Sequence, residues 1–222
     1  MFRVKICGVT SPADALMACE AGADAIGINF YSASPRFCAP EVAQQIAASI
    51  PPGVCRVGVF VNASANEIRE LAARVPLDLV QLHGDESPEF ARSIRPLPYA
   101  KALGVGSDLQ PIATYLAGCH RLNAMPRMLL VDAVRKGQFG GTGQTIDWDL
   151  LRQNRQQLRG VPLVLAGGLK PDNVAQAIAA VRPWAVDVAS GVESAPGKKS
   201  AELVRQFVEA AKVALSAKPP RG

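Results

Sequence analysis

The stretch VPLVLAGGLKPDNVAQAIAAVRPWAVDVASGV, residues 161–192, contains one complete unit of the repeat that decides the fold. Within it, Leu163–Ala166 and Val186–Ala189 are short apolar runs that predict strands, and Asn173–Val181 has the apolar spacing of a helix. Continuous apolar strands joined through a helix are typical of parallel strands that helices cover on one face. The stretch therefore predicts a βαβ unit.

The same alternation of apolar runs and amphipathic stretches extends along the chain of 222 residues. The predicted strands are Val4–Cys7, Ala25–Phe30, Val57–Val61, Leu79–Leu82, Tyr99–Leu103, Met128–Asp132, Leu163–Ala166 and Val186–Ala189. The predicted helices are Ala13–Ala21, Glu41–Ile50, Glu67–Val75, Pro88–Ile94, Leu109–Leu116, Trp148–Leu158, Asn173–Val181 and Glu202–Leu215. Because so many β/α units close into a barrel more readily than they form an open sheet, we expect an α/β protein with a single-domain (β/α)₈ TIM barrel over residues 1–215. Residues 216–222 are predicted to form a flexible tail.

Three of the predicted helices carry clear start signals. Ser11-Pro12 and Ser87-Pro88 each place a capping hydroxyl before a proline that suits the first turn. Ser64 is followed three residues later by Glu67, which is the spacing of a capping box. These signals support the helical assignment of the segments that follow them.

Composition and charge limit the class of partner. With 49% apolar and 19% charged residues, the chain has enough hydrophobic material for a large core. Its net charge of +5 suits an anionic partner, but there is no long basic run and aromatic residues make up only 5%, which argues against nucleic-acid binding. We therefore expect a phosphorylated small molecule as substrate, no nucleic-acid partner, and a monomer or a homodimer.

Cysteine usage and the first residues indicate the compartment. The five cysteines are odd in number and lack any C-x-x-C spacing, which argues against a disulfide framework and a zinc site. The first residues already read as a strand, with no signal-peptide pattern, and no apolar run is long enough to cross a membrane. These features predict a cytoplasmic protein with no membrane anchor.

Cys7 is the first candidate for chemistry, because reactive groups of such a barrel sit at the carboxyl ends of strands and on the loops that follow. A free cysteine is usually a small buried apolar residue. At the end of the first strand, beside Lys5 or a loop cation, it is also a candidate thiolate that acts as a base. The residues alone leave both interpretations open. The remaining cysteines are expected in helices or at strand flanks and are interpreted as packing residues: Cys19, Cys38, Cys55 and Cys119.

Asp132 is the second candidate, because four apolar residues of the sixth predicted strand precede it and carry its carboxyl to the barrel mouth. A carboxyl on a buried strand is costly without a partner or a task. One interpretation is a structural hydrogen bond to a neighbouring loop. The other is a general acid that partial desolvation keeps protonated.

Glycine-rich segments follow the late strands and predict a phosphate site. Glycine lets backbone N–H groups approach a phosphate, and barrels commonly hold phosphate between the loops after strands seven and eight. The predicted phosphate-binding residues are Gly141, Thr142, Gly143, Gly167, Gly168, Ser190 and Gly191.

Two further residues stand near the mouth. Arg36, on the loop after the second strand, is either a solvated surface arginine or a bidentate clamp for a substrate carboxylate. His83 ends the fourth strand, but with two histidines in the chain and no H-x-H pair, a metal site is not expected. The role of His83 and that of Asp187 are not decided by the sequence.

These motifs together resemble the phosphoribosylanthranilate isomerase family of tryptophan biosynthesis over nearly the whole chain. The segments that carry the resemblance are Lys5-Ile6-Cys7-Gly8-Val9-Thr10, Gly22-Ala23-Asp24-Ala25-Ile26-Gly27, Ser34-Pro35-Arg36, Gln81-Leu82-His83-Gly84-Asp85, Gly141-Thr142-Gly143 with Asp147-Trp148, Ala166-Gly167-Gly168-Leu169 and Ser190-Gly191-Val192-Glu193.

The resemblance implies an Amadori rearrangement of N-(5-phosphoribosyl)anthranilate to 1-(2-carboxyphenylamino)-1-deoxyribulose 5-phosphate, without a cofactor. It further implies that Cys7 is the general base, that Asp132 is the general acid, and that Arg36 binds the anthranilate carboxylate.

Several alternative functions fit the sequence less well than this interpretation. The histidine-pathway isomerase has a glycine-rich loop in each half and an aspartate where this chain has Cys7, and a pentose-phosphate epimerase needs metal-binding histidines. A noncatalytic phosphometabolite sensor should lack either the acid or the base, and both candidates are present here. A basic nucleic-acid binder is disfavoured by the scattered charge.

Overall fold

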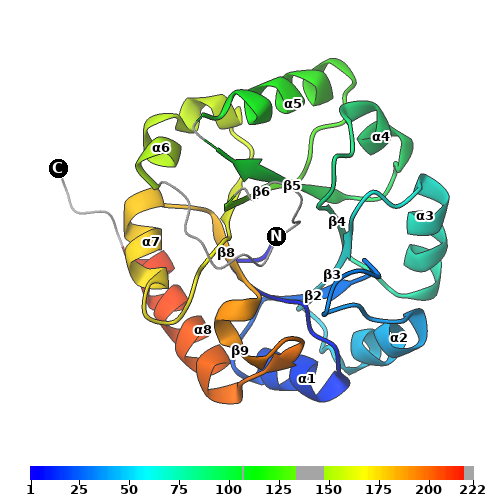
Figure 1. The fold of residues 1–222 in the computed structure, drawn as a ribbon, viewed down its shortest axis with the longest axis vertical. Helices are drawn as coiled ribbons and strands as arrows, with labels where there is room; N and C mark the ends of the chain where they lie inside the picture. The colour runs from blue at the N-terminus through cyan, green and yellow to red at the C-terminus, as the bar shows by residue number, and fades with distance from the viewer. Residues whose placement is uncertain (107, 134–147, 218–222) are drawn as a thin grey trace.

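The computed structural model describes residues 1–106, 108–133 and 148–217. In it, eight parallel strands close into a barrel in sequence order, with β1 hydrogen-bonded to both β2 and β8 (Figure 1). The strands are β1 (Val4–Cys7), β2 (Ala25–Asn29), β3 (Cys55–Phe60), β4 (Leu79–Leu82), β5 (Tyr99–Val105), β6 (Met128–Ala133), β7 (Leu163–Leu165) and β8 (Ala185–Val188). The predicted TIM barrel is confirmed.

Helices surround the barrel on its outer side (Figure 1). They are α1 (Pro12–Glu20), α2 (Pro40–Ser49), α3 (Ala65–Arg74), α4 (Pro88–Ser93), α5 (Gln110–Arg121), α6 (Trp148–Gln153), α7 (Val174–Val181) and α8 (Ala201–Ser216), with short 3₁₀ helices η1 (Arg155–Leu158) and η2 (Ser190–Val192). The predicted caps are present: Ser11 and Ser87 each accept from the backbone N–H three residues on, and Ser64 forms the reciprocal capping box with Glu67.

Two helices differ from their predicted bounds by more than two residues, in each case for a local reason. The predicted helix 148–158 breaks into α6 and η1 at Asn154, whose side-chain amide donates to the Leu150 carbonyl (2.9 Å) and competes with the helical ladder. By contrast, α5 continues past Gly118, where glycine lets the helix pack closely on α4. A Cβ at Gly118 would lie 2.7 Å from Pro88 Cγ.

A small antiparallel hairpin after β8 was not predicted, because its strands β9 (Glu193–Ala195) and β10 (Lys198–Lys199) are too short to show a period. Its turn contains Gly197 at φ +80°, and the Gly197 carbonyl accepts from Thr10 Oγ1 (2.6 Å). The hairpin therefore joins the loop after β8 to the loop after β1 at the barrel mouth.

Side chains along each strand point alternately into the barrel interior and outward to the helices. On β1, Val4 and Ile6 are fully buried in the apolar layer between barrel and helices, which places Lys5 and Cys7 on the inner face. Small and apolar residues such as Ala25, Val57 and Ala185 fill the lower interior. The lower barrel interior is thus a packed apolar core, and the inward-facing Lys5 and Cys7 are exceptions that require polar partners or a function.

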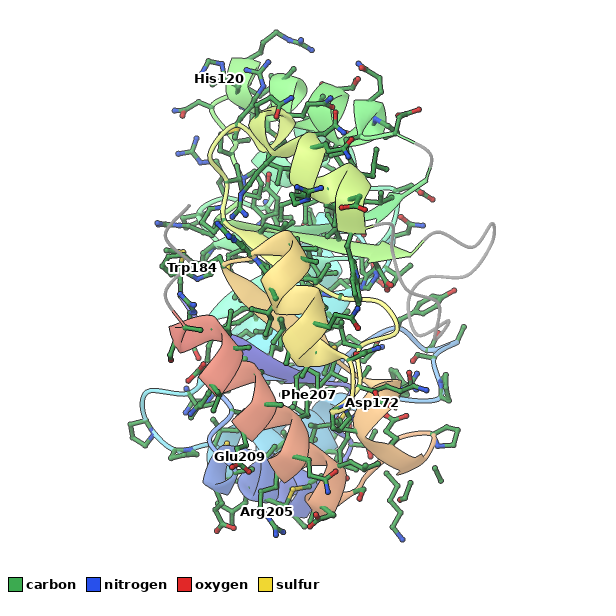
Figure 2. The ribbon with its side chains drawn as sticks, turned by 90° about the vertical axis from the view of Figure 1, so that its left-hand side faces the viewer. His120, Asp172, Trp184, Arg205, Phe207 and Glu209 are labelled. Atoms are coloured by element: carbon green, nitrogen blue, oxygen red, sulfur yellow. The ribbon has the colours of Figure 1, made fainter. Side chains whose placement is uncertain are left out.

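The side view distinguishes the two ends of the barrel. Figure 2 shows Asp172, on the loop after β7, at one end and Trp184, just before β8, at the other. On α8 in the same view, Phe207 is fully buried, whereas Arg205 and Glu209 are exposed.

The final helix extends past its predicted end. α8 includes Ser216, which the sequence assigned to the tail, and residues 218–222 lie outside the described part of the chain. Among the helices described, none has the length and apolar character needed to cross a membrane.

Candidate active site

A cavity of about 450 Å³ opens at the carboxyl ends of the strands and brings the predicted site residues together. Those that line it are Cys7, Arg36, His83, Asp132, Gly167, Gly168, Ser190 and Gly191, joined by Asp187. The predicted phosphate-binding residues Gly141, Thr142 and Gly143 lie outside the described residues. Within the described ranges, no group of three or more His, Cys, Asp or Glu side chains gathers as a metal site.

Cys7 reaches the cavity from the end of β1, and the strand beside it leaves room for the thiol. Gly27 of β2 pairs with Cys7, and a Cβ on Gly27 would lie 2.8 Å from Cys7 Sγ and 3.1 Å from Lys5 Cε. Glycine is therefore required at this position, because the inner faces of β1 and β2 are occupied there by the two β1 side chains. Cys7 as a whole residue is partly exposed and lines the cavity.

A buried ion pair lies below the thiol. Lys5 Nζ donates to Asp187 Oδ1 at 2.9 Å, and the Lys5 side chain has no solvent exposure. The two residues are paired across β1 and β8, so the barrel closure itself sets this contact. Buried ion pairs often contribute little net stability, because desolvation offsets their attraction. Because Lys5 and Asp187 both act electrostatically on the Cys7 thiol, an electrostatic role is the better interpretation of the pair.

The charges around Cys7 oppose one another. Burial raises the pKa of the Cys7 thiol, the Lys5 ammonium lowers it through its charge and a hydrogen bond, and the Asp187 carboxylate raises it again. Lys199 adds a weaker lowering effect, and the net shift is upward. For Lys5, burial works against the charged form, but Asp187 and the thiolate together raise its pKa, so the ammonium stays protonated.

Arg36 crosses over the β1 loop to reach the cavity. Gly8, at φ +70°, permits this, because a Cβ there would lie 2.4 Å from Arg36 Cδ. The turn is fixed by Ser34 Oγ, which accepts from the Arg36 backbone N–H (3.1 Å) and from Asn29 Nδ2 (3.1 Å).

Glu193 holds the Arg36 guanidinium in place. Nε and Nη2 of Arg36 donate to the two Glu193 oxygens at 2.8 and 2.7 Å, and Lys199 Nζ donates to Glu193 Oε1 at 2.7 Å. Burial alone would raise the pKa of Glu193, but the hydrogen bonds from Arg36 and Lys199 lower it, so the carboxylate is charged. This pairing uses two of the five guanidinium N–H groups, so the other three are not engaged by Glu193.

Asp132 enters the cavity from β6. It pairs with Gly104 of β5, and 8% of its surface is exposed. The strand position predicted from the sequence therefore carries its carboxyl into the same cavity as Cys7.

The loops after β7 and β8 approach each other closely at their glycines. Gly167 and Gly168 have φ of +79° and +64°, and a Cβ at Gly191 would lie 1.9 Å from the Leu169 carbonyl oxygen. Asn173 Nδ2 donates to the Gly168 carbonyl (3.0 Å) and so fixes the first loop. Gly167, Gly168 and Gly191 all line the cavity.

His83 completes the cavity wall, directly after β4. Its Nδ1 lies 3.0 Å from Gln81 Nε2, and its backbone N–H donates to the Phe60 carbonyl (2.8 Å). Burial lowers the pKa of His83 to about 3, with additional lowering from Lys5 and Lys101, so the imidazole is neutral.

A closed (β/α)₈ barrel with a thiol, a carboxyl and glycine-rich late loops around one cavity defines a barrel enzyme that acts on a small anionic molecule. The sequence profile of the family described as N-(5'phosphoribosyl)anthranilate (PRA) isomerase matches residues 4–210. The chain belongs to this family and is an isomerase.

Individual relatives agree with the family. A protein from Trichlorobacter lovleyi named N-(5'-phosphoribosyl)anthranilate isomerase is 50% identical over 218 residues, covering 97% of this chain and 100% of that protein. The Thermotoga maritima phosphoribosyl anthranilate isomerase structure has a TM-score of 0.85 and 43% identity, covering 96% of this chain and 100% of that one. A phosphoribosyl anthranilate isomerase structure in complex with reduced 1-(o-carboxyphenylamino)-1-deoxyribulose 5-phosphate has a TM-score of 0.82 and 41% identity, with the same coverages of 96% and 100%.

Proposed function

We propose that the chain catalyses the Amadori rearrangement of N-(5-phosphoribosyl)anthranilate with Cys7 as general base and Asp132 as general acid. The observation that supports this most directly is that both side chains line one cavity, reached from β1 and β6, beside the glycine loops of β7 and β8. The family supplies the reaction, and the cavity supplies one acid and one base for it.

The chemistry divides between the two groups. Asp132 donates a proton to the furanose ring oxygen, the C1–O bond breaks, and the anthranilate nitrogen forms a Schiff base with C1. The Cys7 thiolate then removes the C2 proton, which gives an enolamine that tautomerises to the ketone. Asp132 has then lost one proton and the Cys7 thiolate has gained one, so proton exchange with water restores both groups, and no external oxidant or reductant is needed.

The phosphate does not react and serves to position the sugar. We place it against the backbone N–H groups of Gly168, Ser190 and Gly191, with Gly141–Gly143 as further members of the same site. From there the ribose extends toward Cys7 and Asp132, and the anthranilate ring lies farthest from β7 and β8.

Turnover of freshly made phosphoribosylanthranilate by the purified protein, followed as loss of anthranilate-type fluorescence, tests the proposal. Conversion to the ribulose phosphate is the expected result. Tight binding of the substrate without turnover would instead favour a sensor built on the same scaffold.

Replacing Arg36 with Met is expected to raise KM about 10- to 100-fold with a smaller change in kcat, because a charge-assisted hydrogen bond to a carboxylate contributes about 1.5–3 kcal/mol. Lys199 still neutralises Glu193 in this variant. Steady-state kinetics give the result, with Arg205→Met on the exposed face of α8 as control. Parental KM and kcat/KM in the Arg36 variant would exclude the guanidinium from the site.

Inorganic phosphate is expected to inhibit competitively, and Gly168→Val is expected to raise KM at least tenfold by blocking the approach of phosphate to the loop backbone. Gly160→Val is a matched control, because Gly160 also has positive φ (+73°) but lies outside the cavity with nothing within 4 Å of a built Cβ. Equal losses in both variants would attribute the effect to backbone strain rather than to phosphate binding.

The state of assembly and the location remain predictions. The chain is predicted to be a monomer or a homodimer in the cytoplasm, and one structural relative, from Thermotoga maritima, is described as a dimeric enzyme. Light scattering on the purified protein measures its mass directly.

A further inference from the structure

His83 lines the same cavity as Cys7 and Asp132, but neither proton transfer of the proposed mechanism uses it. It is partly accessible from the cavity and follows β4, which lies on the opposite side of the closed barrel from β8 (Figure 1). A polar side chain after β4 can therefore contact the end of a ligand that extends away from the loops after β7 and β8.

The contact with Gln81 determines which ring nitrogen carries the proton. Gln81 lies on β4 and His83 directly follows that strand two residues later, and Gln81 Nε2 lies 3.0 Å from His83 Nδ1. An amide nitrogen can only donate, so Nδ1 accepts and the proton of the neutral ring is on Nε2. Gln81 is itself buried, with 2% of its surface exposed, so water does not compete for this contact.

The segment that carries His83 is held rigidly on the outer side of the barrel. Lys101 Nζ donates to the Gly84 carbonyl (2.6 Å) and to Glu86 Oε2 (2.7 Å), and Glu86 accepts from the backbone N–H groups of Gly84 and Asn62. Lys101 and Glu86 are almost fully buried. The imidazole is therefore placed before any ligand arrives, which reduces the entropy lost on binding.

Burial keeps the His83 ring neutral, and nearby positive charge adds to the effect. Lys5 inside the barrel and Lys101 outside it both oppose protonation, in addition to burial. A neutral imidazole with its Nδ1 already occupied cannot act as a base, and it presents one donor, Nε2–H, to the cavity.

We propose that His83 is a substrate-binding residue that donates a hydrogen bond from Nε2 to a substrate oxygen at the end remote from the phosphate. The proposal rests on the proposed function, which places the phosphate at β7 and β8. Two acceptors fit this chemistry: the anthranilate carboxylate and a ribose hydroxyl.

The protonation state is tested by ¹⁵N NMR of the free enzyme, which does not depend on turnover. The chain has two histidines, and the second, His120, is exposed on α5 (Figure 2), so it serves as an internal control. We expect His83 to show a protonated Nε2 and an unprotonated Nδ1 throughout the neutral pH range. Gln81→Met should mix the two tautomers. A protonated Nδ1, or an imidazolium at neutral pH, would overturn the proposal.

Binding measurements then identify the acceptor. The probes are reduced 1-(o-carboxyphenylamino)-1-deoxyribulose 5-phosphate and its phenylamino analogue, which lacks the carboxylate. His83→Phe keeps a planar ring but removes the donor, and His83→Gln places an amide N–H near the Nε2 position and should restore most of the affinity.

The size of the affinity loss in His83→Phe, and whether it affects one probe or both, distinguishes the carboxylate from the hydroxyl as the acceptor. A loss of about 10- to 100-fold in His83→Phe for the carboxylated probe alone supports the carboxylate, since hydrogen bonds to charged groups are the stronger ones. A loss of up to about tenfold for both probes supports a hydroxyl. Unchanged affinity for both probes in a folded variant would overturn the role of His83, whereas absence of turnover by the parent enzyme would overturn the proposed function instead.

Discussion

Replacing Cys7 with serine is expected to lower kcat by about 10²–10⁴ while KM stays within a few-fold of the parent. Serine keeps the shape of the side chain, but its hydroxyl is far too weakly acidic to supply an anionic base. The loss falls on kcat because, in the proposed mechanism, the thiolate acts on the C2 proton in the transition state and does not contribute to binding of the ground state. Steady-state kinetics with phosphoribosylanthranilate measure it.

Cys19→Ser is the matched control, because Cys19 is a free thiol on α1 outside the cavity. It should leave kcat unchanged. A substrate deuterated at C2 adds a second readout: if proton removal from C2 becomes slow in Cys7→Ser, the primary isotope effect should increase. A kcat near that of the parent in the folded Cys7 variant would contradict the assignment of Cys7 as base.

The pH dependence follows from the direction of the Cys7 shift. Because burial raises the thiol pKa more than Lys5 lowers it, alkylation of Cys7 by iodoacetamide should accelerate with rising pH until the pH passes an elevated pKa. In the proposed mechanism the active form combines a Cys7 thiolate with a protonated Asp132. The kcat profile is therefore expected to have one limb from ionisation of Cys7 and a second limb from ionisation of Asp132.

The electrostatic role of Lys5 follows from the same argument. Each unit by which the ammonium lowers the thiol pKa increases the population of the active form tenfold. The sequence placed Lys5 beside Cys7, but it did not reveal Asp187 as the partner of Lys5, because that contact is made across the barrel closure between β1 and β8.

Strand ends were the part of the site that the sequence could predict. In a parallel barrel the carboxyl ends of all strands meet at one mouth, so locating Cys7 and Asp132 at strand ends was sufficient to place both in one cavity. The glycines after β7 and β8 were found in the same way. The strand pattern therefore predicts where along a strand each of these residues lies.

Partners that depend on side-chain direction could not be predicted. In the sequence, Glu193 stands out only as part of a glycine motif. In the structure both its carboxylate oxygens accept hydrogen bonds from Arg36, and Lys199 of the two-residue strand β10 donates to one of them. The hairpin that brings these residues together is too short to have a periodic signal. Gln81 beside His83 was similarly hidden, because its amide lies inside a strand that reads as part of the core.

Replacing Asp132 with asparagine is expected to lower kcat by about 10²–10⁴ with KM within a few-fold, because the amide keeps the size and hydrogen-bonding capacity of the side chain but has no proton to transfer to the ring oxygen. Steady-state kinetics measure the change. Asp149→Asn, at an exposed carboxylate on α6, is the control and should leave kcat unchanged.

Isotope effects separate the two roles. In Asp132→Asn the opening of the furanose becomes slow, so the isotope effect from deuterium at C2 should fall toward one, opposite to the increase expected for Cys7→Ser. The double variant should lose little beyond the worse single variant, because groups that act on one reaction sequence are strongly non-additive. A kcat near that of the parent in Asp132→Asn, or an isotope effect that rises in both single variants, would remove Asp132 from the acid step and leave Cys7 to be paired with another proton donor.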